Sequence, residues 1–215
     1  MSKIIKAMLG VCLAAAGGAA SAVPFYVTHA SLDPQSGYGD EFCESTLICG
    51  PSKLDVEFST SNFSAKAFSL AKVGDKYSFT VGRVKFQEDD AWGLFTTYGI
   101  TGKELDNLGV SLDLRFAMPG AAVNTVKATG TAYLGKIGDS AVDYKLSWDP
   151  LTYGFGRGGS YTISLNTLSF TDTSSAWRDL TATVTLKTNE VPEPGSLALL
   201  GLGMLGVGVM RRKAE

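Results

Sequence analysis

The chain contains 215 residues, and its 19 basic and 21 acidic side chains nearly balance to a net charge of −2. Five of the basic side chains but only two of the acidic ones lie in the terminal segments 1–22 and 191–215, so residues 23–190 carry a net charge of −5. A mildly acidic body with dispersed charges lacks the clustered basic face that binds phosphates, which excludes nucleic acid as a partner. The body has the length of one ordinary domain.

Residues 1–22 have the pattern of a cleaved signal peptide. Lys3 and Lys6 form a positive start, an apolar run rich in alanine follows, and Ala20-Ser21-Ala22 supplies the small residues that signal peptidase accepts. The pattern predicts cleavage between Ala22 and Val23 and export of the remaining chain. An uncleaved N-terminal anchor is the alternative, which the shortness of the apolar run disfavours.

Residues 23–51 contain Pro, Gly, Ser and Asp but few periodic apolar residues, which predicts an irregular lead-in to the domain. Two cysteines, Cys43 and Cys49, lie within it. An even pair in an exported chain favours a disulfide that would pin this lead-in, with a reduced pair as the alternative. A structural zinc site has four protein ligands. The two cysteines and the single histidine, His29, are too few, so we expect no metal there.

From residue 52 to 190 the sequence alternates apolar and polar residues and is rich in Val, Thr, Phe and Tyr. Such alternation is typical of strands that place one face on a core and the other in water. The expected strands are Leu54–Phe58, Ala67–Val73, Lys76–Phe86, Gly93–Ile100, Val110–Phe116, Val123–Leu134, Val142–Trp148, Tyr161–Phe170 and Thr181–Lys187. About nine antiparallel strands predict an all-β fold, a β-sandwich that resembles a jelly roll.

Catalytic patterns are weak in this domain. A Ser-His-Asp triad would have to use His29 in the lead-in, and no Gly-x-Ser-x-Gly motif is present. A carboxylate pair could serve a glycosidase, and its candidates are Glu57, Glu88, Asp89, Asp90, Asp113 and Asp143. The sequence does not show whether any two of these side chains face each other. We therefore expect a protein that is not an enzyme and needs no cofactor, with a glycosidase or polysaccharide lyase on a β-sandwich as the less favoured alternative.

Two further features could bind a ligand. The run Glu88-Asp89-Asp90 offers the carboxylate oxygens that Ca²⁺ prefers, but it lacks the spacing of a calcium loop, so a solvated loop is favoured. Trp92, Trp148 and Trp177 could stack on sugar rings as in a carbohydrate-binding module, although core packing is the usual role of tryptophan in a sandwich. A carbohydrate-binding module is therefore kept as an alternative function.

The last 25 residues consist of the motif Val191-Pro192-Glu193-Pro194, the uncharged apolar segment Gly195–Met210 and the basic end Arg211-Arg212-Lys213. The prolines disfavour helix and keep the motif extended, and the apolar segment predicts a short membrane helix. The basic residues resist translocation and keep the end of the chain in the cytoplasm. The helix would be short and rich in glycine, which suits a temporary anchor better than a permanent one.

This order of motif, apolar segment and basic end resembles the PEP-CTERM sorting domain of Gram-negative bacteria. The resemblance covers the tail, and it implies that exosortase, a membrane-embedded cysteine transpeptidase, cleaves near Val191–Pro194. It also implies export machinery and, transiently, the inner membrane as partners. Such proteins often occur alongside exopolysaccharide synthesis, so we expect a destination at the cell surface or in the extracellular polysaccharide matrix of a biofilm. The catalytic residues of this processing step would belong to exosortase.

Overall fold

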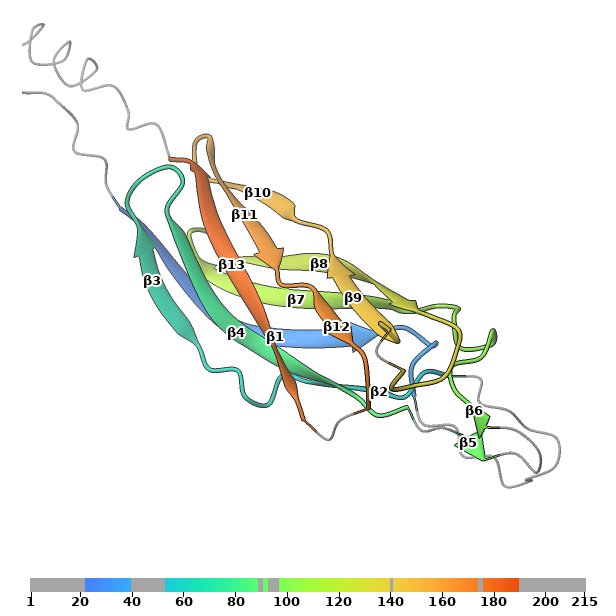
Figure 1. Ribbon diagram of the computed structural model, residues 1–215. Coiled ribbons are helices and arrows are strands. Elements are labelled where there is room, and N and C mark those ends of the chain that lie inside the picture. The colour runs from blue at the N-terminus through green and yellow to red at the C-terminus, as the bar shows by residue number, and fades with distance from the viewer. Residues whose placement is uncertain are drawn as a thin grey trace, which may run out of the picture.

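The structure is a computed structural model that describes residues 22–39, 53–88, 91–92, 97–139, 141–173 and 176–189. Within these ranges the chain is all-β, with 13 strands in two antiparallel sheets and one two-stranded ribbon (Figure 1). The predicted all-β class is thereby confirmed. No helical segment in the described ranges has the length and apolarity needed to cross a bilayer. The predicted signal peptide, apart from Ala22, and the predicted membrane helix lie outside these ranges.

The first sheet has the strand order β12-β9-β8-β7-β1-β3. Its strands are β1 (Val23–Pro34), β3 (Lys66–Leu70), β7 (Gly109–Met118), β8 (Ala122–Ala132), β9 (Tyr144–Trp148) and β12 (Leu168–Phe170). Three consecutive strands, β7, β8 and β9, form a meander within this one sheet. In a jelly roll most consecutive strands cross between the sheets, so the meander separates this fold from a regular jelly roll.

The second sheet has the strand order β10-β11-β13-β4-β2. Its strands are β2 (Val56–Ser59), β4 (Lys76–Phe86), β10 (Leu151–Phe155), β11 (Gly159–Leu165) and β13 (Arg178–Thr188). The separate ribbon pairs β5 (Ala91–Trp92) with β6 (Thr97–Tyr98). The alternation predicted for residues 181–187 is confirmed, because Ala182, Val184 and Leu186 are fully buried while their neighbours are not.

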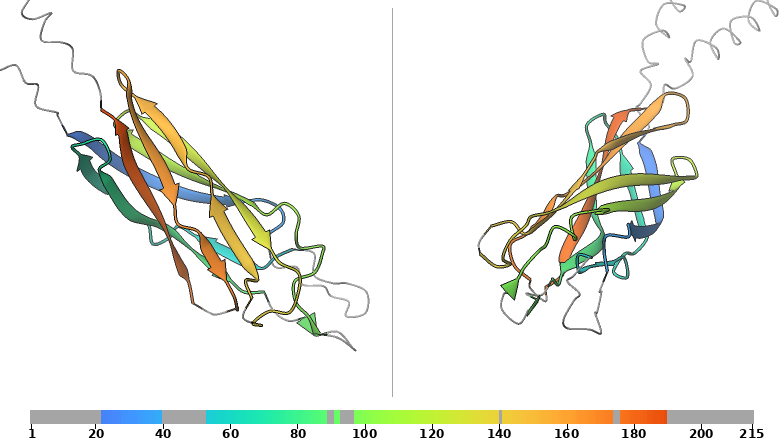
Figure 2. Two further views of the ribbon diagram at one scale, coloured as in Figure 1. Left: turned by 45° about the horizontal axis from the view of Figure 1, so that its top comes forward. Right: turned by 90° about the vertical axis from the view of Figure 1, so that its right-hand side faces the viewer.

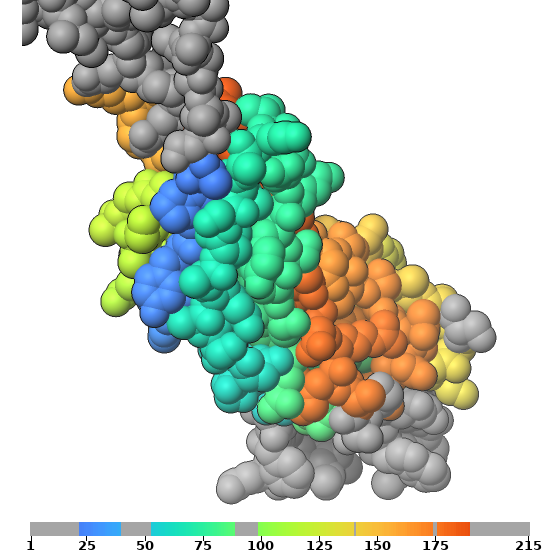
Figure 3. Space-filling view, turned by 90° about the vertical axis from the view of Figure 1, so that its left-hand side faces the viewer, coloured from blue at the N-terminus to red at the C-terminus, as the bar shows by residue number. Residues whose placement is uncertain are grey.

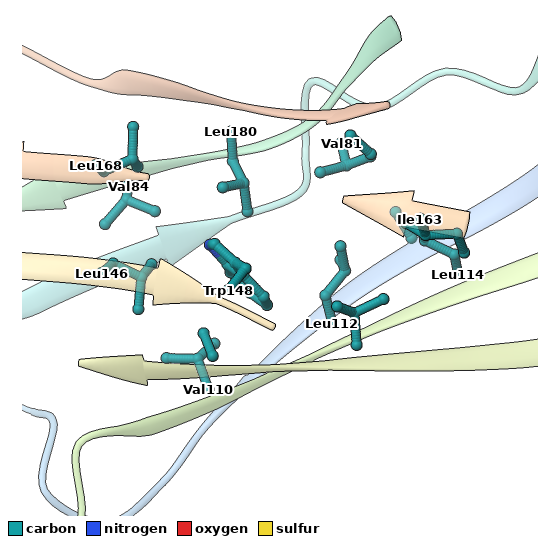
Figure 4. Close-up of a cluster of buried hydrophobic side chains, with 14 of the residues drawn as sticks. Val81, Val84, Val110, Leu112, Leu114, Leu146, Trp148, Ile163, Leu168 and Leu180 are labelled. Carbon is teal, nitrogen blue, oxygen red and sulfur yellow. The ribbon is translucent and has the colours of Figure 1, made fainter. Parts of the chain in front are cut away.

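The two sheets contribute to a single hydrophobic core. Figure 4 shows Val81, Val84 and Leu180 from the second sheet opposite Leu112 and Leu146 from the first. Aromatic rings also meet across the layers, with Phe25 of β1 at 5.2 Å from Tyr161 of β11, measured between ring centroids. Sheets that share a core in this way support the predicted sandwich.

The predicted irregular lead-in is wrong for its first part, because Val23–Pro34 forms the twelve-residue strand β1. Val23, Phe25 and Val27 are buried, but Pro24 and Tyr26 occupy the outward positions between them and conceal the alternation in the sequence. Pairing with β3 on one side and β7 on the other imposes the extended conformation. Cys43 and Cys49 lie outside the described residues, so the predicted disulfide stays a prediction.

The structure also divides one expected strand and adds another. The segment Tyr161–Phe170 is split into β11 and β12, which belong to different sheets. Asn166 sits at the division, where its side chain accepts a hydrogen bond from the Thr181 amide (2.7 Å) and donates one to the Asp179 carbonyl (3.2 Å). The added strand β10 follows Pro150 and contains Gly154, residues that favour a loop, yet it pairs along its whole length with β11.

Both ends of the folded domain lie at the same end of the molecule (Figure 2). Val23, the first residue of β1, pairs with Leu70 at the end of β3. The loop that follows β3 is tied to the end of β13, since the Gly74 amide donates to the Leu186 carbonyl at 2.8 Å. The start of β11 also meets the end of β13, because the hydroxyls of Ser160 and Thr188 are 2.8 Å apart. We call this end, formed by residues 22–23, 71–76, 156–160 and 186–189, the terminal pole, and the opposite end the distal pole.

Candidate functional site

The three predicted sugar-stacking tryptophans do not form one exposed platform in the described structure. Trp148 lies on β9 with only 7% of its side chain exposed and belongs to the hydrophobic core (Figure 4). Trp177 is partly buried, and the guanidinium of Arg83 on β4 covers its ring at 4.4 Å. The side chain of Trp92 is outside the description. A buried ring has no face to offer a sugar, so Trp148 acts in the core.

The candidate carboxylates in the described part of the chain are dispersed rather than paired with one another. Glu57 is exposed on β2. Asp113 on β7 accepts a hydrogen bond of 2.5 Å from the Thr125 hydroxyl. Asp143 is buried, and its Oδ2 accepts a hydrogen bond from the Gly138 amide at 3.3 Å. These bonds hold strands and turns, which gives Asp113 and Asp143 a structural partner each.

Glu88 is the exception, because the structure brings it beside Glu104 at the distal pole. Both side chains are buried. Glu88 Oε2 accepts a hydrogen bond from the Asp55 amide at 2.8 Å. Glu104 Oε2 accepts one from the Thr101 amide at 2.5 Å, while Glu104 Oε1 is buried without a hydrogen-bond partner. Sequence reasoning missed Glu104, although its Thr-x-x-Glu spacing from Thr101 is the capping-box signal that could have found it.

The buried site changes the protonation of Glu88. Burial raises the pKa of Glu88 to about 7, with the nearby carboxylates of Glu104 and Asp55 adding to the rise, and the hydrogen bond from the Asp55 amide opposing it. A carboxyl with this pKa holds a proton part of the time at neutral pH, as general acids do. Among the described residues, however, no group of three or more His, Cys, Asp and Glu side chains is placed to hold a metal ion. Asp89 and Asp90, the other members of the calcium candidate, lie outside the description.

Two buried tyrosine hydroxyls meet near the same pole. The Tyr38 hydroxyl donates to the Leu108 carbonyl at 2.7 Å and lies 2.8 Å from the Tyr144 hydroxyl. Burial raises the pKa of both hydroxyls well above the ordinary tyrosine value. Gly130 makes room for this pair, since a Cβ there would lie 2.2 Å from the Tyr38 hydroxyl oxygen. The hydroxyls therefore stay protonated and hold the core together.

The predicted processing sites flank the described domain. Ala22 is exposed, whereas Val23 on the other side of the predicted signal-cleavage bond is 6% exposed and begins β1. At the other end, β13 ends at Thr188, three positions before the sorting motif begins in the sequence at Val191. The motif and the basic residues Arg211, Arg212 and Lys213 lie outside the described residues. The described domain thus lies between the two predicted processing signals.

Comparison with known families identifies the tail. Residues 190–213 match the family model of the PEP-CTERM protein-sorting motif. The matched range contains the predicted motif, apolar segment and basic end, so the resemblance expected from the sequence is confirmed. No curated protein and no solved structure gives a significant match to the chain.

The chain is therefore a PEP-CTERM domain-containing protein. It is an exported protein with a membrane-anchored C-terminal sorting signal of Gram-negative bacteria, and exosortase recognises that signal. The match covers the tail alone, so it assigns the sorting route. The role of the domain between residues 22 and 189 has to be inferred from the structure of that domain.

Proposed function

We propose that this protein is a non-enzymatic β-sandwich that the exosortase pathway delivers to the cell surface or into the exopolysaccharide matrix of a biofilm. The observation that carries the proposal is the sorting motif at residues 190–213, which follows directly on a domain that has its own core. A temporary membrane helix over Gly195–Met210 and a disulfide between Cys43 and Cys49 belong to the same proposal.

The bonding of the polar side chains supports a structural role for the domain. Asp113 and Asp143 are engaged in strand and turn contacts, and the Tyr38 and Tyr144 hydroxyls pair with each other inside the core. A catalytic carboxylate pair would instead need two acids placed to flank a bound sugar. The carbohydrate-binding alternative is disfavoured by the burial of Trp148 and by the guanidinium that covers Trp177.

Mass spectrometry of the surface and matrix fractions tests the delivery step. We expect peptides from the domain in these fractions but no peptide that contains Leu197–Lys213, because exosortase would have removed that segment. The double variant P192A/P194A should remain in the membrane fraction with its C-terminus intact, since the motif would no longer be held extended. Recovery of an intact C-terminus from the matrix of the wild-type strain would refute the processing.

Enzyme activity has a separate test. The processed protein is incubated with the exopolysaccharide of the producing strain, and the release of reducing ends and of unsaturated sugars is followed. We expect neither product above the level of a heat-denatured control. If either appears and is abolished by Glu88→Gln, the domain is an enzyme and the proposal fails.

A further inference from the structure

We propose that the terminal pole is a membrane-docking surface that binds anionic lipid headgroups while the C-terminal tail anchors the protein. The inference rests on the sorting tail and on the surface of the described domain, and it holds whatever the domain does after processing. The partner is the bilayer in which the apolar segment Gly195–Met210 inserts.

Basic side chains gather at this pole from separate parts of the chain. Lys72 lies in the loop after β3, and Lys76 opens β4 beside Thr185 of β13. Lys187 lies near the end of β13, and Arg157 lies in the turn between β10 and β11; all four basic side chains are exposed. The turn reaches β13 through the Thr188 hydroxyl, which donates to the Gly158 carbonyl at 2.8 Å.

Among the described residues of this pole the acid is Asp75, and the fold already uses it. Asp75 Oδ2 accepts hydrogen bonds from the amides of Ala71 (3.0 Å) and Lys72 (2.9 Å), which hold the loop in its turn. At the distal pole the charge balance is reversed, because acidic side chains outnumber the lysines there. The described carboxylates of this pole are Asp55, Glu88, Glu104, Asp106, Asp139 and Asp143. The domain is therefore polarised along its length, with positive charge at the end from which the tail leaves.

Exposed apolar side chains accompany the basic ones. Val73, at the tip of the loop between β3 and β4, is 63% exposed. Tyr26 and Met118 are 42% and 44% exposed. They pair with each other across β1 and β7, close to the terminal pole. Figure 3 shows the blue start of β1 and the teal loop side by side at this end of the molecule. Surfaces that lie at a lipid interface typically combine exposed apolar side chains with basic neighbours.

The position of the tail brings this surface to the bilayer. Five residues, 190–194, separate the described end of the domain from the apolar segment. Even fully extended they would span about 18 Å, so the anchored pole stays close to the headgroups. Such a short tether gives the pole a high local concentration at the membrane, and several weak lysine contacts then suffice for docking. The docked domain would present Val191–Pro194 at a fixed height and orientation for exosortase.

Hydrogen–deuterium exchange on the full chain in lipid vesicles tests the proposal. The chain is reconstituted in vesicles of phosphatidylcholine alone or of phosphatidylcholine with phosphatidylglycerol, and exchange is followed by mass spectrometry. We expect the amides of residues 71–76 and 156–160 to exchange at least about threefold more slowly on the anionic vesicles, and high salt to abolish the difference. Amides of the distal segment 101–108 should exchange equally on both.

A matched pair of variants assigns the effect to the basic side chains. K72E/K76E should lose the lipid-dependent protection, whereas K103E/K136E, which reverses two exposed lysines of the distal pole, should keep it. Unchanged thermal unfolding of both variants would show that the fold is intact. Equal protection on neutral and anionic vesicles would overturn the proposal. Protection that K72E/K76E removes on both lipids alike would also overturn it, because the lysines would then bind Glu190 or Glu193 of the tail instead of the bilayer.

Discussion

The two halves of the domain are built from similar aromatic rings but differ in their buried carboxyl groups. Towards the terminal pole, Phe25 packs against Phe68, Phe116, Phe155 and Tyr161 with ring centroids 5.0 to 6.4 Å apart. Towards the distal pole, Phe86 and Phe170 pack on Tyr144, whose hydroxyl is inside the core. The buried carboxylic acids of the described residues, Glu88, Glu104 and Asp143, also lie in this distal half.

This difference teaches where each kind of perturbation should act. Ring packing is insensitive to pH and is lost in proportion to the apolar volume removed. Buried hydroxyls and carboxyls stabilise the fold only while each is bonded and in the right protonation state. Substitutions of buried rings in the terminal half should therefore have large effects at every pH, and those of buried polar groups in the distal half should depend on pH or on the partner that is lost.

The largest effect is expected for Phe25→Ala in the terminal half. Phe25 is 1% exposed and touches four other rings, so its truncation should lower the free energy of unfolding by about 3–5 kcal/mol. Urea unfolding of the full chain in nonionic detergent, followed by tryptophan fluorescence, measures the loss. The neighbouring control Tyr26→Ala, at a side chain 42% exposed, should cost less than about 1 kcal/mol. Similar losses for both would contradict the assignment of β1 and its buried face.

The next effect is a pH-dependent one in the distal half, from Glu88→Gln. Because the pKa of Glu88 is raised from 4.5 to about 7 in the folded protein, the folded state holds its proton more tightly than the unfolded state. Wild-type stability should then fall as the pH rises from about 4.5 to 7, and the variant should lack this fall. At pH 8 the variant should be more stable by at most about 3 kcal/mol, and at pH 4 the two proteins should be alike.

Urea unfolding across this pH range measures the difference. Glu104 and Asp55 face Glu88 and should be left unchanged in the experiment. Glutamine keeps an oxygen that can accept the hydrogen bond of the Asp55 amide, so the fold should survive the change. The terminal-half variant Phe25→Ala serves as the control, since its loss should be the same at every pH. A stability gain of Glu88→Gln at pH 4 as large as at pH 8 would show that ionisation is not the cause.

The smallest effect separates the two members of the tyrosine pair. Tyr38→Phe leaves the Tyr144 hydroxyl buried without its partner and should cost about 2 kcal/mol. Tyr144→Phe leaves the Tyr38 hydroxyl bonded to the Leu108 carbonyl and should cost about 1 kcal/mol. The double variant should cost less than the sum of the two, which a double-mutant cycle in urea would measure. The reverse order of the two single variants would exclude this hydrogen-bond direction.

Much of the fold class was readable from the sequence, because strand alternation is a local property. The segment Thr181–Lys187 shows this plainly, since each apolar residue in it is buried in β13. Strand β1 could not be predicted in this way, because Pro24 and Tyr26 stand at its outward positions and its extended form comes from distant partners. The break at Asn166 was also hidden, since its side chain bonds to β13 residues 13 and 15 positions away.

The sequence by itself determined that the protein is exported and sorted, since the tail is a linear signal that exosortase recognises. It also determined the all-β character of the domain through the period of two. Only the tertiary structure decided which polar residues meet, because Glu88 and Glu104 are separated by segments whose path no local pattern sets. It also decided that the first strand begins and the last strand ends at the same pole, since that depends on strand order and not on any residue within the strands.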